Sequence, residues 1–366
     1  MNNLSMLLNI TEDNVNLFVV LGMFVSFAFL ASRFNKYLQG KYINPYISPQ
    51  RIHTKEVSRL GGLVMLVGVF MLAQVIENSV TSNIIFKFIL AFSPLAALTL
   101  LEDLHIHINP LIRLATLLLI GFFILFFTNI ALPVFSTPFL SHLLNQPFVG
   151  IIFFGFCIAG LINGMNFIDG TNGNLFLVMT SILGNLMYLG GITNDYDFVL
   201  IVILFFTPLF IFNFFNYPWG KIFAGDLGAY FYGASAGFLT IYFFGKNPDI
   251  SSWNAILVVF YPISELIYSI VRKVLCKKSP LLPDRDHLHI KVYNIFFKAT
   301  KNPLLSNNLV VIFLCIFWMS PIVILPWVYQ SHLLLSLSLF ALTTAYILIN
   351  MLIPSESEMI NKKNSK

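Results

Sequence analysis

The stretch PFVGIIFFGFCIAGLI, residues 147–162, is apolar over almost the length of a membrane span and runs directly into NGMNFIDGTNGN, residues 163–174. A second apolar run, LFLVMTSILGNLMYLGG at residues 175–191, follows at once. A helix needs about 20 largely apolar residues to cross a bilayer core, and both runs approach that length. Amides, a carboxylate and glycines are therefore concentrated where the chain is expected to turn between two membrane helices.

Apolar runs of this kind recur along the whole chain. Of its 366 residues, 57% are hydrophobic and 10% are charged, whereas a soluble domain carries about 25% charged residues. The charges cluster between the runs, which predicts an all-α, polytopic integral membrane protein, with one transmembrane domain over residues 1–366 and a short polar tail at 353–366. About 11 membrane helices are expected, at residues 15–33, 60–76, 82–101, 111–128, 147–163, 173–192, 198–214, 229–245, 254–271, 308–328 and 332–352.

Lys and Arg set the expected orientation, because they are enriched in the cytoplasmic loops of membrane proteins. When the spans are counted through, all 21 Lys and Arg residues except Lys87 and Lys246 fall on one face. We therefore predict an N-terminus outside and a C-terminus in the cytoplasm. The first span is expected to be retained rather than cleaved, since Glu12 and Asp13 precede it in place of basic residues.

Unusual polar residues gather on the loops assigned to the cytoplasmic face, and ionisable groups at a membrane are costly enough to suggest a site. Asn163, Asn166 and Asp169 are spaced by three, so they form a stripe along the end of a helix. Gly170 and Gly173 follow and allow close approach to the backbone. An ordinary helix cap made of Asn and Gly is the alternative, but a cap needs only one or two such residues.

Two further segments supply carboxylates. Glu102 and Asp103 are adjacent, directly after a predicted span, where they can hold a divalent cation or act as a base; a solvated loop is the alternative. Asp226 lies between Gly225 and Gly228 at the start of an apolar run. That setting suits Mg²⁺, which takes one or two protein carboxylates and completes its shell with water and substrate phosphate.

Three further groups of residues on the same face are amides, an aromatic ring and cations. FNYPWGKIFAGDLGAYFYG contributes Asn216 and Phe223, whose ring can stack on a base, although core packing is the plainer role in a chain with 39 Phe. SPLLPDRDHLHIKVY contributes Arg285, His287 and His289, which suit contact with a pyrophosphate.

SPQRIHTKEVSRLGG contributes Lys55 and Arg59 immediately before Gly61-Gly62, an arrangement suited to a phosphate or simply to a positive loop. Carboxylates, amides and cations at one membrane face are the groups that metal-assisted transfer at a phosphate requires.

In order and spacing, these five motifs resemble those of the polyprenyl-phosphate N-acetylhexosamine-1-phosphate transferases, over about residues 45–295. The resemblance implies transfer of a sugar-1-phosphate from a UDP-N-acetyl sugar to undecaprenyl phosphate, with release of UMP and with Mg²⁺, or alternatively Mn²⁺, as cofactor. It further implies a bacterial inner-membrane enzyme with a cytoplasmic active site that initiates O-antigen, lipopolysaccharide or another surface polysaccharide. The expected partners are the two substrates and the lipid bilayer, with no nucleic acid; a homodimer stays open.

The resemblance also assigns roles to individual residues. It implies catalytic roles for Asp103, at the lipid phosphate, and for Asp169, near the nucleotide, and it makes Asp226 the Mg²⁺ ligand. The substrate-binding residues that it implies are Lys55, Arg59, Glu102, Asn163, Asn166, Asn172, Asn216, Phe223, Arg285, His287 and His289.

The chain departs from the family pattern at three positions. Glu102 replaces the usual first Asp, Asn172 stands where a second Asp often follows Asp-Gly, and Ile290 interrupts a fuller histidine cluster. The last two departures favour a surface-polysaccharide branch over phospho-N-acetylmuramoyl-pentapeptide transferase, which remains the alternative.

Two functions of other classes compete with the transferase. A secondary transporter would place ionisable groups near the bilayer midplane and show symmetry between its halves, and a membrane scaffold would need no such groups. Within the transferase reading, direct displacement at the β-phosphorus and a two-step route through an enzyme-bound phosphate both stay open.

Overall fold

The computed structural model describes residues 19–31, 57–76, 79–103, 109–279 and 286–354. Within these ranges the chain is helical, and its one β feature is an isolated bridge between Ser58 and Ile222. Lys55 and Arg285 lie outside the described residues, and so does the side chain of Asp103.

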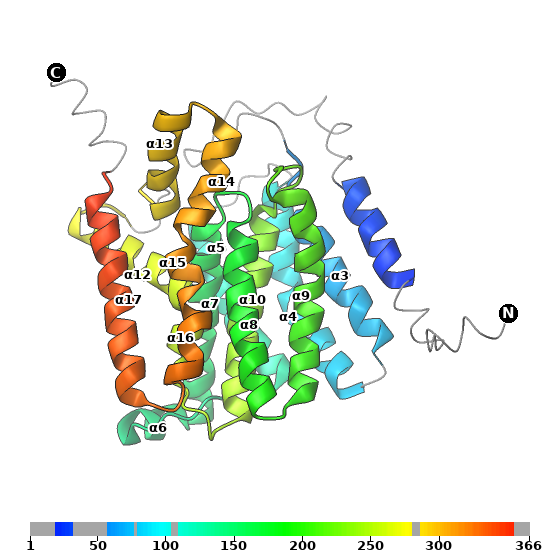
Figure 1. Cartoon of the computed structure of the whole chain (residues 1–366). Coiled ribbons are helices and arrows are strands. Elements are labelled where there is room, and N and C mark those ends of the chain that lie inside the picture. Colours follow the sequence, from blue (N-terminus) through cyan, green and yellow to red (C-terminus); the bar gives the residue numbers. More distant parts are fainter. Residues whose placement is uncertain (1–18, 32–56, 77–78, 104–108, 280–285, 355–366) are drawn as a thin grey trace, which may run out of the picture.

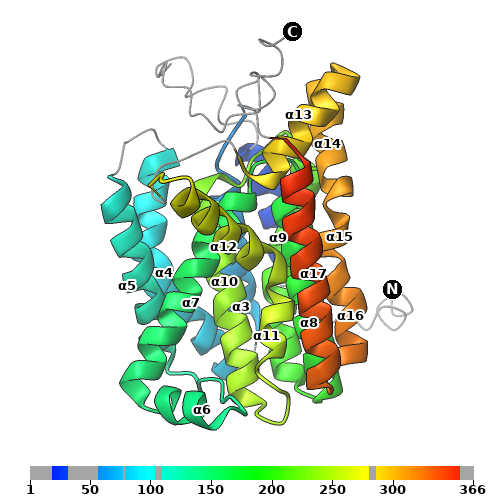
Figure 2. The same ribbon diagram turned by 90° about the vertical axis from the view of Figure 1, so that its left-hand side faces the viewer.

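The helices form one bundle, preceded by an apolar helix at Val19–Ala31 (Figures 1 and 2). They are α3 (Gly61–Val75), α4 (Ser79–Asp103), α5 (Pro110–Thr128), α6 (Pro138–Leu144), α7 (Pro147–Ile168), α8 (Asn174–Ile192), α9 (Tyr196–Asn216), α10 (Gly225–Lys246), α11 (Asn254–Val258), α12 (Phe260–Leu275), α13 (Leu288–Thr300), α14 (Pro303–Phe313), α15 (Cys315–Trp318), α16 (Ser320–Val328) and α17 (His332–Leu352).

The expected multi-pass, all-α class is confirmed. In the described part of the chain, eight helices are long and apolar enough to cross a membrane, and Val19–Ala31 and α3 are shorter apolar helices. Successive long helices alternate in direction, as the sequence predicted. One end of the bundle, where α4, α7 and α9 finish and α3, α8 and α10 begin, carries the predicted site motifs and is called the polar end; it is uppermost in Figure 1.

Three elements differ from the sequence-based expectation. The single span predicted at 254–271 is broken at Val259 into α11 and α12. Two short helices, α6 and α13, fall in segments that were expected to be loops. Neither is long enough to cross a bilayer, so neither forms a membrane-length apolar run in the sequence.

Helix α12 is amphipathic with its polar side turned inward. Glu265, Ser269 and Lys273, spaced by four along one face, are buried, whereas Val271 and Leu275 are exposed. In water the apolar face of a helix would be the buried one. Facing lipid with its apolar residues, α12 hides charged groups inside the protein, where partners can satisfy them.

Helix α10 is the centre of the bundle. It packs against α3, α4, α7 and α8, and 94% of its membrane-length window is buried. Its sequence, GDLGAYFYGASAGFLTIYFFGK, is rich in small residues, which let neighbouring backbones approach closely. A Cβ at Gly233 would come within 2.5 Å of the Cα of Ile162 on α7. This helix therefore contacts protein rather than lipid along almost its whole length.

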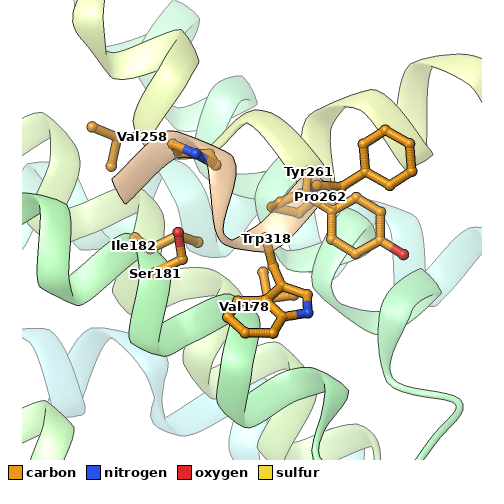
Figure 3. A pocket seen from close by; sticks show the side chains of 9 residues that line it. Val178, Ser181, Ile182, Val258, Tyr261, Pro262 and Trp318 are labelled. Atoms are coloured by element: carbon orange, nitrogen blue, oxygen red, sulfur yellow. The ribbon is translucent and has the colours of Figure 1, made fainter. Parts of the chain in front are cut away.

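Two interrupted membrane segments, α11–α12 and α14–α16, pack against α8. Val259 separates α11 from α12, and Leu314 and Met319 interrupt the span that α14, α15 and α16 make up. A small crevice, drawn in Figure 3, lies where these breaks meet α8. Its lining is mainly apolar: Val178, Ser181, Ile182, Val258, Tyr261, Pro262, Phe317, Trp318 and Pro321.

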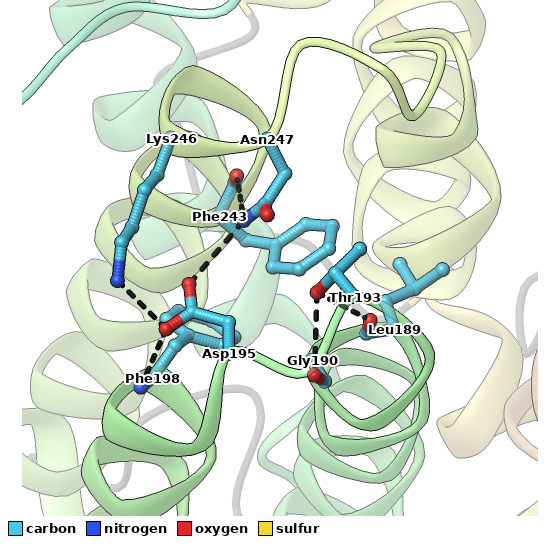
Figure 4. Close-up of polar contacts among 8 residues, drawn as sticks. All are labelled: Leu189, Gly190, Thr193, Asp195, Phe198, Phe243, Lys246 and Asn247. Atoms are coloured by element: carbon cyan, nitrogen blue, oxygen red, sulfur yellow. Dashed lines mark hydrogen bonds and ion pairs between the residues drawn. The ribbon is translucent and has the colours of Figure 1, made fainter.

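At the end opposite the polar end, one carboxylate joins the α8–α9 turn to α10 (Figure 4). Asp195 accepts a hydrogen bond from the N–H of Phe198, 3.2 Å away, and so caps α9. The same carboxylate forms an ion pair with Lys246 Nζ at 2.7 Å and accepts from Asn247 Nδ2 at 3.4 Å. Lys246, one of two exceptions to the charge asymmetry, is thus paired with an acidic residue.

The close contact between α5 and α7 gives a test of the packing. A Cβ at Gly121 would overlap the carbonyl oxygen of Gly155, whereas a Cβ at Gly191 on α8 meets nothing within 4 Å. Gly121→Ala should lower the stability by about 1–3 kcal/mol, because overpacking must push the two helices apart. Thermal unfolding of the detergent-solubilised protein measures the change, and Gly191→Ala, the same substitution in open space, should leave the midpoint equal or slightly higher.

Candidate active site

Backbone hydrogen bonds between distant segments assemble the polar end. The N–H of Phe223 donates to the carbonyl of Ser58 at 2.7 Å, and the N–H of Gly61 donates back to the carbonyl of Phe223 at 3.0 Å. Gly62 N–H donates to Ala224 O at 2.8 Å. A Cβ on Gly62 would overlap the backbone nitrogen of Gly228. The paired glycines thus serve helix contact, and they bring the start of α3 onto the start of α10.

Four predicted site residues meet at this junction and form what we call the carboxylate cluster: Arg59, Glu102, Asn166 and Asp226. Asp226 Oδ1 lies 3.6 Å from Arg59 Nη2 and accepts a hydrogen bond from Asn166 Nδ2 at 3.4 Å. Glu102 Oε1 lies 3.9 Å from Arg113 Nη1. The charge of Glu102 also interacts with those of Asp226 and Arg59. Residues separated by up to 167 positions in the sequence therefore share one polar site.

The carboxylate cluster fits a divalent cation. The second carboxylate oxygen of Glu102 is buried and accepts no hydrogen bond, and the negative charge of Asp226 opposes that of Glu102. Across the described ranges, no three His, Cys, Asp or Glu side chains are grouped so that they could enclose a metal ion. Mg²⁺ needs no such cage, since one or two carboxylates hold it while water and phosphate complete the octahedron.

The segment 163–174 lies beside this cluster, which it contacts through Asn166. Asn163 and Asn166 lie on α7, and Asp169 is its C-cap residue, so the predicted stripe at a helix end is correctly placed. Gly173, with φ of 79°, precedes α8, and Asn174 Nδ2 donates to the carbonyl of Ile168 at 2.7 Å. The turn is therefore closed by its own amides, and Asn163 and Asn166 remain partly exposed.

Two predicted substrate-binding amides, Asn216 and Asn172, are buried inside the protein. Asn216 Oδ1 accepts from the N–H of Gly173 at 2.6 Å, and its Nδ2 donates to the carbonyl of Ile222 at 2.8 Å. Asn172 is buried, with its side chain against Gly220. In the structure these two residues tie the α7–α8 turn to the α9–α10 loop, which also carries the partly exposed Phe223.

The two histidines converge, as the sequence allowed, but below the surface. His287 is the N-cap of α13, and its ring lies parallel to that of His289 with centroids 5.9 Å apart. His289 packs so closely on Gly170 that a Cβ there would overlap its imidazole. Burial, together with neighbouring His287, lowers the pKa of His289 to about 3, so this ring is neutral at pH 7 and carries a single N–H.

The structure adds functional candidates that the sequence motifs did not include. Glu265 on α12 is buried beside His287, Tyr346 on α17 is buried beside Glu265, and Lys273 Nζ lies 5.8 Å from the ring centroid of Phe167. Arg113 joins the carboxylate cluster from the start of α5. The four-residue spacing of Glu265, Ser269 and Lys273 within an apolar segment is the signal that could have found the first of them.

Comparison with known proteins indicates a multi-pass membrane phosphotransferase. The model of glycosyl transferase family 4 matches residues 84–244, from α4 to α10. This match, together with the relatives described next, supports the resemblance to the polyprenyl-phosphate N-acetylhexosamine-1-phosphate transferases.

Three relatives carry names of this kind. A protein of Bacillus subtilis (strain 168), named a probable undecaprenyl-phosphate N-acetylglucosaminyl 1-phosphate transferase, is 28% identical over 253 residues, covering 66% of this chain and 67% of its own. An undecaprenyl-phosphate alpha-N-acetylglucosaminyl 1-phosphate transferase of Thermotoga maritima is 27% identical, over 66% and 69% of the two chains. A protein of the same name from Escherichia coli O157:H7 is 26% identical over 51% of each chain.

The hydrogen bonds of Asn216 give a test of the site's assembly. Asn216→Asp keeps an acceptor for Gly173 N–H but places a buried negative charge against the carbonyl of Ile222, so stability should fall by about 1–3 kcal/mol. Activity should fall with it, by about tenfold or more, because the two loops lose their connection. Thermal unfolding and turnover are measured together. Asn145→Asp, an exposed amide at the opposite end, should change neither.

Proposed function

We propose that the protein transfers N-acetylhexosamine-1-phosphate from a UDP-sugar to undecaprenyl phosphate, releasing UMP, as the first step in the synthesis of a bacterial surface polysaccharide. The observation that carries the proposal is the convergence of Asp226, Glu102 and Arg59 with Asn166 at one end of a membrane bundle. The names of the three relatives support the lipid acceptor, and they make UDP-N-acetylglucosamine the first donor to test.

The chemistry we infer is an in-line displacement. An oxygen of the lipid phosphate attacks the β-phosphorus of the UDP-sugar; the new P–O bond forms as the bond to the bridging oxygen breaks, and UMP leaves with that oxygen. Asp103, next to Glu102 at the end of α4, is proposed to accept a proton from the lipid phosphate. Arg59 offers a cation to the phosphates, and Asn163, Asn166 and Asp169 are proposed to face the nucleotide.

Mg²⁺ is proposed as the cofactor, held by Asp226 with Glu102 close by, and when bound it would screen the charge of the diphosphate. Asn166 and Arg59, both in contact with Asp226, would fix the orientation of that carboxylate. The carboxylates lie at the end of the bundle rather than near its middle, which favours a transferase over a transporter.

The polar end is proposed to face the cytoplasm of a bacterial inner membrane. Among the described Lys and Arg residues, those at the helix ends and loops of the polar end are Arg59, Arg113, Lys221, Arg272, Lys273, Lys277, Lys278, Lys291, Lys298 and Lys301. This asymmetry is the pattern of cytoplasmic loops. A UDP-sugar and the lipid phosphate head group would then meet at the inner leaflet.

The direct test is reconstitution. The purified protein with Mg²⁺, undecaprenyl phosphate and a panel of UDP-N-acetyl sugars should release UMP with at least one sugar, measured by a coupled nucleotide assay. Chelation with EDTA should abolish release, and added Mg²⁺ or Mn²⁺ should restore it. Absence of UMP release with every sugar, or turnover that survives chelation, contradicts the proposal.

Asp226 gives a second test. Asp226→Asn removes the charge proposed to hold the cation and should lower turnover by about 100-fold or more, with the protein still inserted and folded. Asp195→Asn makes the same change at the opposite end, where it breaks the pair with Lys246. That control should reduce thermal stability but leave turnover per folded molecule near the wild-type value. Equal losses in both variants would mean that Asp226 has only a structural role.

A further inference from the structure

A buried hydrogen-bonded chain links α17, α12 and α13. Tyr346 donates its hydroxyl to Glu265 Oε2, and Glu265 Oε1 lies 2.9 Å from His287 Nδ1. Exposed fractions of the three residues are 1%, 1% and 2%. Both carboxylate oxygens of Glu265 are thus engaged by side chains from two other helices, outside the segment that the family model matches.

Ring contacts connect His287 to the end of α7. The His287 ring lies 4.8 Å, centroid to centroid, from that of Phe167, and the stacked His289 packs on Gly170. Phe167 directly follows Asn166, and Gly170 directly follows Asp169. The two imidazoles therefore support, from inside the protein, the segment whose amides and carboxylate face the proposed nucleotide site.

A second contact holds the same helices together. Lys291, one turn beyond His287 on α13, donates from Nζ to the carbonyl of Asn350 at 3.1 Å, and Asn350 lies one turn beyond Tyr346 on α17. Helix α17 is thus attached to α13 both directly and through Glu265. A carboxylate buried this deeply is costly unless it is paired and hydrogen-bonded, so its surroundings are ordered around it.

We propose that Glu265, held by Tyr346, is a positioning residue that fixes the ring of His287 and, through it, the last turn of α7 at the nucleotide subsite. A carboxylate on one imidazole nitrogen sets both the tautomer and the orientation of the ring. This inference rests on the proposed function, since it assigns a substrate to the α7 segment. It adds that the last membrane helix, remote from the carboxylate cluster, determines how well the UDP-sugar binds.

The test separates positioning from general stability by steady-state kinetics. Glu265→Gln removes the charge and Tyr346→Phe removes one hydrogen bond, and both should raise the KM for the UDP-sugar, by about 10- to 100-fold and several-fold respectively. The KM for undecaprenyl phosphate should stay within about twofold of wild type, because that substrate meets other residues. A merely structural defect would instead reduce the fraction of active protein, so the apparent kcat would fall while both KM values stayed unchanged. That result would overturn the proposal.

A double-mutant cycle gives an independent readout. In a His287→Ala background, Glu265→Gln and Tyr346→Phe should change the KM for the UDP-sugar by less than about twofold, because the ring through which they act is gone. Additive effects would overturn the proposal. Tyr232→Phe is the matched control, since Tyr232 is equally buried and donates to the carbonyl of Phe205 at 2.9 Å far from this chain; it should leave both KM values unchanged. Wild-type protein that turns over no UDP-sugar would refute the proposed function itself, a result that the variants cannot mimic.

Discussion

The hydrogen bonds from Gly61 and Gly62 to the carbonyls of Phe223 and Ala224 hold the start of α3 against the start of α10, and the polar end depends on them. Inside a membrane protein a backbone group without a partner is expensive, so a non-helical segment at this depth must dock on another one. The docking leaves no room for a Cβ at either glycine. It also carries Arg59 to Asp226, so the same contact that satisfies the backbone assembles the charges.

The all-α membrane fold class could be predicted from the sequence, because the length of the apolar runs reflects the thickness of a bilayer. The predicted spans at 111–128, 173–192 and 332–352 end within a residue of α5, α8 and α17. The break at Val259 was not predictable in this way, since a continuous apolar run carries no record of where a helix is interrupted. Helix α13 was not predicted because it is short and because polar residues are mixed with its apolar ones, so it forms no membrane-length apolar run.

The site was predictable as a set of residues but not as a geometry. Spacing placed Asn163 and Asn166 correctly on one helix, and motif order placed Asp226 at the same end. The spacing could not predict how deeply each side chain is buried in the protein. Asn172 and His289 were expected at the substrate, and the structure buries both, because Asn172 packs against Gly220 and His289 packs on Gly170. The role of Glu265 depends on a partner from α17, which no local pattern reveals.

Helix α10 is enclosed by protein along nearly its whole length, and Asp195 ties its far end to the α8–α9 turn through Lys246. A helix so confined cannot tilt or slide without opening voids around it. Adaptation to the two proposed substrates would therefore fall to the outer layer of the bundle, where α12 and α17 meet through the Tyr346–Glu265 hydrogen bond and through ring contacts of Tyr346 with Tyr261 and Tyr268. Lipid would contact that outer layer rather than α10, because α10 is almost entirely buried and α17 is not. Lipid composition therefore has a physical route to influence turnover without disturbing Asp226.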